Sequence, residues 1–483
     1  MNKPIRRVAI ACLLMFGLLL VNANYLQAIK AEDLRKDSRN SRNFFARYKV
    51  DRGSITAGNV TLAESKEVGG EFKYQRNYPH GPLYAHVTGF FGPENAIGVE
   101  GAENSMLDGS DSRLAVSRFV DMVTGKPPKG ATIEVTINPK AQKAAYNALK
   151  ASGKKGAVVA LDPKTGAILT LVSVPTYDPN QLAPANKAKV NEAYNKLDKD
   201  KDKPLLNRAL NQAYPPGSTY KVVTAAAFLS DDEGRNAQTQ VDAPTSLDLP
   251  QTSHNLPNSG GAACGSGQVT LMYALQRSCN TPFAKMGMEL GYNKMNEQAK
   301  KFGVGEPLSV PAVVDRSDFG PADMTQASLA MSSIGQFSVS MTPLQMAMVA
   351  AGIANEGKVM KPYLVKKVVG PDNSEIEATE PSELSEAVTP EVAHELRDMM
   401  KAVVSQGTGS AAQIQGVEVA GKTGTAQTEP GRAPHAWFIS FAPASDPKVA
   451  VAVIVESGSA GTEASGGQTA APIAREVIKA VVD

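Results

Sequence analysis

The stretch Tyr214-Pro215-Pro216-Gly217-Ser218-Thr219-Tyr220-Lys221 predicts a break in the backbone followed at once by a helix. The Pro-Pro-Gly turn cannot continue a helix, whereas the residues after Ser218 are mostly apolar through Leu229. A serine here lies at the positive end of the helix, and Lys221 follows on the same face one turn later. A serine hydroxyl needs a base to become a nucleophile, and a buried lysine can be that base if its pKa is lowered. The simpler alternative is that Ser218 only caps the helix.

Two later motifs could give this pair its chemical partners. Ser278-Cys279-Asn280 precedes a proline, which indicates a loop, and its two polar side chains could relay a proton and hold a substrate amide. Taken alone, it is better explained as a turn or a helix cap. Lys422-Thr423-Gly424-Thr425 follows an alternating segment and predicts an edge strand. There Gly424 would let a substrate backbone approach, and Lys422 and the two threonines could bind a carboxylate. The charge of Lys422 could also lower the pKa of Lys221.

The same region matches the phosphate-binding pattern G-x-x-x-x-G-K-[ST] from Gly416 to Thr423. A phosphate loop has to pass from a strand through a loop into a helix. Here residues 417–420 alternate as a strand does, and residues 424–431 are a poor start for a helix. We therefore favour the strand over a nucleotide site.

The composition argues against some broad classes of function. The chain has 483 residues, which at the usual domain size corresponds to roughly two to four domains. Its formal net charge of +2 argues against a nucleic-acid-binding protein. The five histidines are scattered and His394 fails the H-E-x-x-H pattern, so we expect no metal site.

The N-terminus predicts a membrane anchor. Basic residues at positions 3, 6 and 7 precede an apolar segment over residues 8–29, and about 20 residues suffice to cross a bilayer as a helix. No clear cleavage site follows, which favours an uncleaved signal anchor over a removed signal peptide. The basic flank predicts a cytoplasmic tail at residues 1–7, a single transmembrane span at residues 8–29 and an extracytoplasmic remainder.

The three cysteines fit this topology. Cys12 would be a small apolar residue within the span. An oxidising exterior permits a disulfide between Cys264 and Cys279, and two unpaired core residues are the alternative.

The exported part predicts two modules and an α+β fold. Residues 30–150 form a small, mainly β module that closes with a helix over residues 139–150. Residues 151–483 form the second module, in which strands at both ends enclose long helical segments, so we expect an antiparallel sheet with helices packed on it. The Lys- and Asp-rich segment 187–203 predicts a solvated loop.

The second module resembles the transpeptidase domain of class B penicillin-binding proteins over nearly its whole length. Serine β-lactamases share the three motifs with this class. Further segments carry the resemblance: Asn207-Arg208-Ala209, Gly335-Gln336, Thr342-Pro343-Leu344-Gln345 and Trp437-Phe438. In the first module, Arg52-Gly53 and Gly98-Val99-Glu100-Gly101 are similar to the N-terminal part of the class. The size of the chain most resembles the actinobacterial penicillin-binding protein A group, associated with septal or division wall synthesis.

The resemblance implies a peptidoglycan D,D-transpeptidase. Ser218 would attack the D-Ala-D-Ala amide of a stem peptide with Lys221 as its base, and Ser278 with Lys221 would protonate the leaving D-Ala. The backbone N–H groups of Ser218 and Thr425 would form an oxyanion hole. An amine of a neighbouring stem peptide would then resolve the acyl-enzyme into a cross-link, and β-lactams would trap Ser218. The implied partners are division-machinery or glycosyltransferase proteins.

Two rival functions keep the same motifs. An exported β-lactamase would need a deacylating glutamate well after the second motif, but Glu289 follows Asn280 too closely and is expected on the next helix. A non-enzymatic divisome protein or β-lactam sensor would keep the fold without the chemistry, and the intact Ser218, Lys221, Asn280 and Lys422 argue against it.

Overall fold

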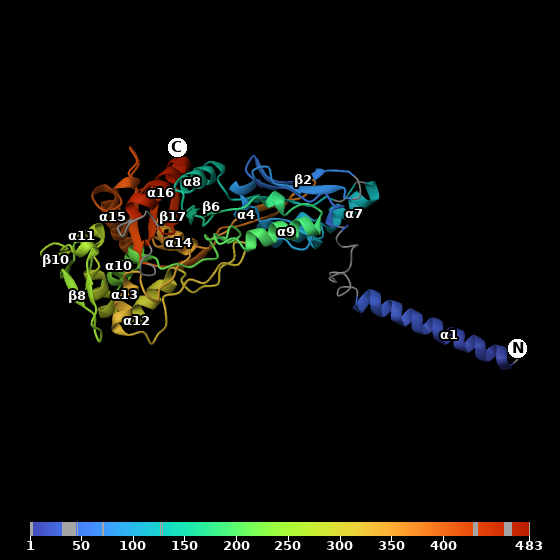
Figure 1. Cartoon of the computed structure of the whole chain (residues 1–483), viewed down its shortest axis with the longest axis horizontal. Coiled ribbons are helices and arrows are strands. Elements are labelled where there is room, and N and C mark those ends of the chain that lie inside the picture. Colours follow the sequence, from blue (N-terminus) through green and yellow to red (C-terminus); the bar gives the residue numbers. More distant parts are fainter. Residues whose placement is uncertain are drawn as a thin grey trace.

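The computed structural model of the chain describes residues 3–30, 45, 47–69, 72–125, 127, 129–427, 433–457 and 466–482. Two β-sheets organise the described part of the chain beyond the N-terminal helix (Figure 1). One has six strands and the other five, with helices packed against them. This mixture confirms the predicted α+β class.

The chain begins with an apolar helix that is long enough to cross a membrane. α1 (Lys3–Asn24) continues into a π-helical turn at Tyr25–Ile29. These 27 residues have no buried side chain, and at 1.5 Å per residue they span about 40 Å. The helix therefore suits the anchor predicted for residues 8–29.

The six-stranded sheet forms the core of the N-terminal module and has the order β13-β12-β4-β1-β2-β3. Its strands are β1 (Ile55–Ala57), β2 (Val60–Glu67), β3 (Tyr74–Asn77), β4 (Thr132–Val135), β12 (Val365–Val369) and β13 (Glu375–Ala378). β1 and β4 run parallel, whereas the other neighbours are antiparallel. The short helices of this module are α4 (Ala85–Thr88), α5 (Gly98–Ala102), α6 (Asn104–Leu107) and α7 (Ala115–Thr124).

Two strands of this sheet come from far along the chain. In the antiparallel pair of β4 and β12, Ile133 lies opposite Val368. The predicted boundary near residue 150 is therefore crossed by the sheet, because residues 365–378 complete a layer that begins at residue 55. β4 pairs with β1 on one edge, and without β12 its other edge would be exposed.

The five-stranded sheet carries the second module and has the antiparallel order β15-β16-β17-β5-β6. Its strands are β5 (Gly156–Leu161), β6 (Ile168–Val174), β15 (Ala420–Ala426), β16 (His435–Ala442) and β17 (Val449–Val455). Helices α8 (Pro139–Ala151) and α16 (Gly466–Val482) pack on one face, and α14 (Pro343–Ala354) packs on the other. Since successive side chains of a strand point to opposite faces, both sets must be apolar, which explains the unbroken apolar sequence of β17.

The remaining helices and short strands come from residues 187–406, which lie between β6 and β15 in the sequence. The helices are α9 (Lys187–Asp198), α10 (Lys221–Ser230), α11 (Leu271–Arg277), α12 (Thr281–Lys301), α13 (Gln326–Ser333) and α15 (Pro390–Gln406). Three two-stranded sheets pair β7 (Gln240–Ala243) with β10 (Gly267–Thr270), β8 (Ser246–Asp248) with β9 (Asn255–Pro257), and β11 (Lys358–Met360) with β14 (Glu383–Glu386).

Helix α9 corrects one prediction. Residues 187–203 were expected to form a solvated loop, but most of them form this helix. Asn186 caps it by accepting a hydrogen bond from the backbone N–H of Lys189. Val190, Tyr194 and Leu197 recur at helical spacing and pack against the core. The charged residues between them obscured this apolar stripe in the sequence.

A buried cluster of charges fixes the N-terminal module. Glu100 accepts hydrogen bonds from Arg52 Nε at 2.7 Å and Arg76 Nε at 2.5 Å, and Tyr78 donates to the same carboxylate at 3.1 Å. Burial alone would raise the pKa of Glu100, but the two guanidinium groups outweigh it and lower this pKa. The cluster therefore joins α5, β3 and the segment before β1 through a single ionised carboxylate.

Substituting Glu100→Gln should destabilise the module strongly, because two buried guanidinium groups lose their counter-charge. We expect the free energy of unfolding in urea, measured on the detergent-solubilised chain, to fall by about 3–5 kcal/mol. The matched control is Glu377→Gln, since Glu377 is exposed and pairs with the exposed Arg113. That change should stay within about 1 kcal/mol. Equal losses in the two variants would contradict this account.

Candidate functional site

The backbone turn that carries Ser218 is held by two hydrogen bonds to distant segments of the chain. Gly217–Tyr220 form a 3-10 turn that leads directly into α10. The N–H of Gly217 donates to the carbonyl of Gly335 at 2.8 Å, and Trp437 Nε1 donates to the carbonyl of Pro215 at 3.0 Å. Trp437 is fully buried. Ser218 itself is half-buried, so its hydroxyl lies at the surface of a rigid turn.

Lys221 links this turn to the second motif. Its side chain is fully buried, and Nζ donates to Asn280 Oδ1 at 2.7 Å and to the carbonyl of Ser278 at 2.8 Å. Ser278 ends α11 in the left-handed conformation (φ 60°), which is uncommon for a serine. Asn280 stands at the start of α12, where its backbone N–H donates to Asn258 Oδ1 at 2.8 Å.

Lys422 closes the group from the edge strand β15. Its Nζ donates to Ser278 Oγ at 2.8 Å and to the carbonyl of Thr423 at 2.9 Å, and its side chain is fully buried. Ser278 therefore presents its carbonyl to one lysine and its hydroxyl to the other. The structure thus brings together Lys221, Ser278, Asn280 and Lys422, which the sequence separates widely.

Burial shapes the charge of both lysines. It lowers the pKa of Lys221 well below its ordinary value of 10.5, and the charge of Lys422 lowers it further. Burial also lowers the pKa of Lys422, to about 7. Within the described part of the chain no carboxylate pairs with either ammonium, so the loss of hydration is offset by hydrogen bonds to neutral acceptors but by no counter-charge. Lys221 is therefore the better candidate for a neutral amine at neutral pH.

β15 lies against the Ser218 turn with very little space between them. A Cβ on Gly217 would lie 2.5 Å from the carbonyl oxygen of Thr425, and one on Gly424 would lie 2.9 Å from that of Pro216. Gln336 Nε2 donates to the Thr425 carbonyl at 3.3 Å. The sequence predicted an edge strand here, and the strand continues through the lysine, which excludes the phosphate-loop interpretation.

Two supporting residues were missed from the sequence. Asn258 accepts from the backbone of both Asn280 and Thr281, and Thr408 shares a hydrogen bond of 2.6 Å with Thr423. Both stand outside the three motifs, and no local pattern marks either of them.

A disulfide joins Cys264 to Cys279, with their Cα atoms 6.0 Å apart. Cys279 lies between Ser278 and Asn280, so the bond ties the middle motif to the loop that follows β9. The disulfide and Asn258 therefore both hold the middle motif to the segment between β9 and β10.

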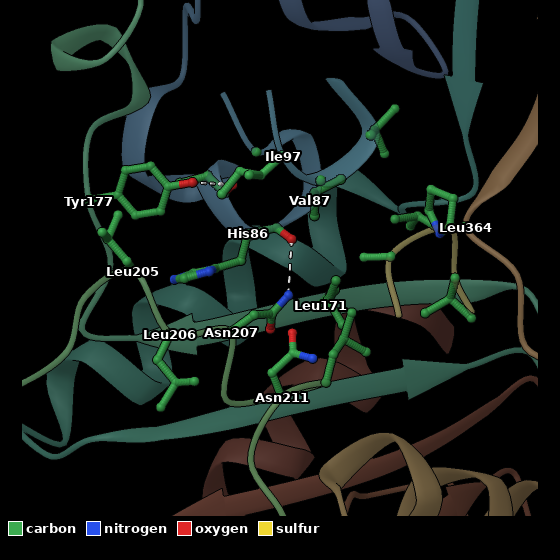
Figure 2. Close-up of a pocket in the computed structure, with 18 residues that line it drawn as sticks. His86, Val87, Ile97, Leu171, Tyr177, Leu205, Leu206, Asn207, Asn211 and Leu364 are labelled. Carbon is green, nitrogen blue, oxygen red and sulfur yellow. Dashed lines mark hydrogen bonds between the residues drawn. The ribbon is translucent and has the colours of Figure 1, made fainter. Parts of the chain in front are cut away.

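A cavity lies elsewhere, at the junction of the two modules. It measures about 290 Å³ and is lined by α4, α5, the segment 205–211 and residues 310–312. Figure 2 shows Asn207 donating across it to the carbonyl of His86, a distance of 3.3 Å. None of the three motifs lines this cavity, so its volume does not mark the reactive site.

The site can activate a hydroxyl and transfer a proton without a metal. Ser218 and Lys221 stand one helical turn apart. Lys221 bonds to the carbonyl of Ser278, and the hydroxyl of Ser278 bonds to Lys422. A neutral Lys221 could accept a proton from Ser218, while the Ser278 hydroxyl, a second group able to carry a proton, bonds to Lys422. Among the described residues no cluster of metal-ligating side chains was found.

Known proteins resemble both parts of the chain. Residues 156–479 match the family described as penicillin binding protein transpeptidase domain, and residues 52–133 match the penicillin binding protein A dimerisation domain. The peptidoglycan D,D-transpeptidase PbpA of Mycolicibacterium smegmatis is 46% identical over 100% of this chain and 99% of its own. Its namesake in Mycobacterium tuberculosis is 43% identical with the same coverage.

Solved structures agree with these matches. The ceftriaxone acyl-enzyme complex of penicillin-binding protein A from M. tuberculosis has a TM-score of 0.87 and 43% identity, over 91% of this chain and 100% of that one. The penicillin G acyl-enzyme complex of the same protein has a TM-score of 0.85 and 43% identity, over 90% of this chain and 100% of that one.

The close packing around the Ser218 turn can be tested with Gly335→Ala. The position has φ +82°, and a Cβ would lie 1.9 Å from the carbonyl oxygen of Gly217. The matched control is Gly416→Ala, which has φ +79° but no atom within 4 Å. We expect the control to lose about 1–2 kcal/mol of unfolding free energy from the backbone conformation alone. Gly335→Ala should lose about 4 kcal/mol or more. Equal losses would show that the turn has room to move.

Proposed function

The chain belongs to the penicillin-binding protein transpeptidase family, and we propose that Ser218 is the nucleophile through which it acts. The chain is a serine-type peptidoglycan D,D-transpeptidase. The observation that carries the proposal for Ser218 is the contact of Lys221 with Asn280 and Ser278. This contact fixes the position of Nζ, and the burial of Lys221 together with the charge of Lys422 supports a neutral base one helical turn from Ser218.

Acylation begins at the penultimate D-alanine of a stem peptide. Lys221 accepts the proton of Ser218 while Ser218 Oγ bonds to the D-alanyl carbonyl carbon. The backbone N–H groups of Ser218 and Thr425 stabilise the resulting oxyanion. The C–N bond then breaks, and the proton passes from Lys221 through Ser278 to the departing nitrogen of D-alanine.

The second half-reaction reverses these proton transfers. The amine of a neighbouring stem peptide attacks the ester carbonyl, and its proton returns through Ser278 and Lys221 to Ser218 Oγ. The ester bond breaks as the new amide forms, so the cross-link appears and the enzyme is regenerated. β-Lactams enter the first half-reaction and remain on Ser218, because their leaving group stays attached.

β15 is proposed to bind the donor peptide. Lys422 and the hydroxyls of Thr423 and Thr425 meet the terminal carboxylate, and Gly424 leaves room for the peptide backbone. Asn280 holds an amide of the substrate while its Oδ1 positions Lys221. This chemistry requires no cofactor or metal.

The proposal includes the membrane topology and the division of the chain. Residues 1–7 form a cytoplasmic tail and residues 8–29 a single span. Residues 30–150 form the non-catalytic module and residues 151–483 the transpeptidase module, both outside the cell. The basic N-terminus supports this direction. The resemblance to the penicillin-binding protein A group supports a role in division or septal wall synthesis, alongside glycosyltransferase or division-machinery proteins.

A β-lactamase activity has little support from the side chains near Asn280. Glu289 lies on α12, where it is mostly exposed and only 3.9 Å from Lys285. It is therefore a solvated partner of a surface lysine. Penicillin should label the protein in a rapid burst, with no steady hydrolysis afterwards.

The nucleophile can be identified by labelling with fluorescent penicillin. Ser218→Ala should abolish the covalent label while circular dichroism shows the fold unchanged, and mass spectrometry of the native chain should place the adduct on Ser218. The matched control is Ser230→Ala at the exposed end of the same helix, which should label normally. An adduct on any other residue would overturn the assignment.

The base can be identified from the pH dependence of acylation. Only neutral Lys221 accepts a proton, so the acylation rate should rise with pH and level off above a midpoint well below 10.5. Below the midpoint the rate should fall about tenfold per pH unit. Lys422→Gln removes a charge that lowers the pKa of Lys221, so the midpoint should move to higher pH. An unchanged midpoint in that variant would contradict the proposed coupling.

A further inference from the structure

Helix α7 presents its apolar side chains to solvent. Exposure is 76% for Val116, 61% for Phe119, 50% for Val120, 71% for Met122 and 68% for Val123. At 100° per residue these five positions form one continuous stripe of the helix. None of the ten residues of α7 is buried. A contiguous apolar stripe of this kind on a surface marks an interaction site.

The opposite face of α7 is polar and lies against the protein. Ser117, Arg118 and Asp121 are half-buried, and Arg118 Nη1 donates to the carbonyl of Gly109 at 2.7 Å. Surface helices of globular proteins have the reverse arrangement, with the apolar stripe toward the core. The orientation of α7 is therefore fixed by polar contacts that turn its apolar stripe outward.

α7 lies where the chain enters the N-terminal module from the anchor. Shortly after the helix, Lys129 pairs with Asp51, and Gly130 N–H donates to the carbonyl of Asp51 at 3.0 Å. Asp51 in turn lies close in sequence to Arg47, where the described part of the module begins. Figure 1 shows α7 at the end of the module that faces the N-terminal helix.

The distance from the anchor to the module is limited by the chain. α1 and its final turn end at Ile29, and the described module begins near residue 45. Fully extended, the intervening residues span at most about 50–60 Å. The module is thus confined close to the surface from which the anchor emerges.

We propose that α7 is an interfacial helix that lies on the outer surface of the lipid bilayer with this apolar stripe in the headgroup and acyl-chain boundary. The inference rests on the membrane anchorage proposed above. A stripe of five apolar residues binds lipid weakly by itself, but the anchor makes the contact intramolecular and keeps the bilayer within constant reach. The helix then acts as a second attachment that fixes the orientation of the module on the membrane.

The test uses the full chain in vesicles of phosphatidylcholine and phosphatidylglycerol, with or without brominated acyl chains. Trp437 is the only tryptophan and is fully buried, so it gives a constant background. In the variant Phe119→Trp, we expect blue-shifted emission from the new tryptophan and a loss of roughly half of its intensity in brominated vesicles. The matched control is Phe337→Trp, an exposed aromatic position in the transpeptidase module, which should not be quenched.

A second variant separates lipid contact from other causes. Adding Val116→Ser, Val120→Ser and Val123→Ser to Phe119→Trp should abolish the quenching while penicillin labelling stays unchanged. Quenching tests the lipid contact and penicillin labelling tests acylation. Failure of this inference can therefore be told apart from failure of the proposed acylation at Ser218. Emission typical of water and no quenching would overturn the proposal. So would a blue shift without bromine quenching, which would show that α7 packs on a second copy of the chain.

Discussion

The reactive centre depends on two buried lysines that share one serine. Lys221 bonds to the carbonyl of Ser278 and Lys422 bonds to its hydroxyl, and each lysine comes from a different layer of the fold. Two ammonium groups so close together and without a carboxylate are unfavourable, so the arrangement favours the loss of one proton. In its left-handed conformation, Ser278 accepts a hydrogen bond from Lys221 at its carbonyl and one from Lys422 at its hydroxyl.

The close approach of two backbones maintains this geometry. Gly217, Gly335 and Gly424 each leave no room for a side chain, and the Ser218 turn is thereby held between β15 and the end of α13. The five-stranded sheet behind it is apolar on both faces and resists distortion. A rigid support of this kind keeps a reacting hydroxyl in position without large reorganisation during the reaction.

The sequence predicted the parts of the site that short patterns encode. Ser218, Lys221 and Lys422 belong to short motifs from which their local secondary structure could be predicted. Most strands of the second sheet can be recognised in the sequence as apolar runs. Asn258 and Thr408 could not be predicted, because only tertiary contacts bring them to the motifs. Helix α9 was missed because its charged residues outnumber the apolar stripe of Val190, Tyr194 and Leu197. The exposed stripe of α7 was also invisible, since an apolar stripe in a sequence does not reveal which way it faces.

The sheet shared by the two ends of the chain has a consequence for how such proteins can diversify. Residues 365–378 are encoded far downstream of residue 150, yet they flank β4 in the first sheet. If recombination joined two lineages near residue 150, β4 would come from one lineage and β12 from the other. Where the side chains of these two strands did not fit, the edge of β4 would be left exposed. Exchange of the N-terminal module between lineages would therefore require a matching change in a strand more than two hundred residues away.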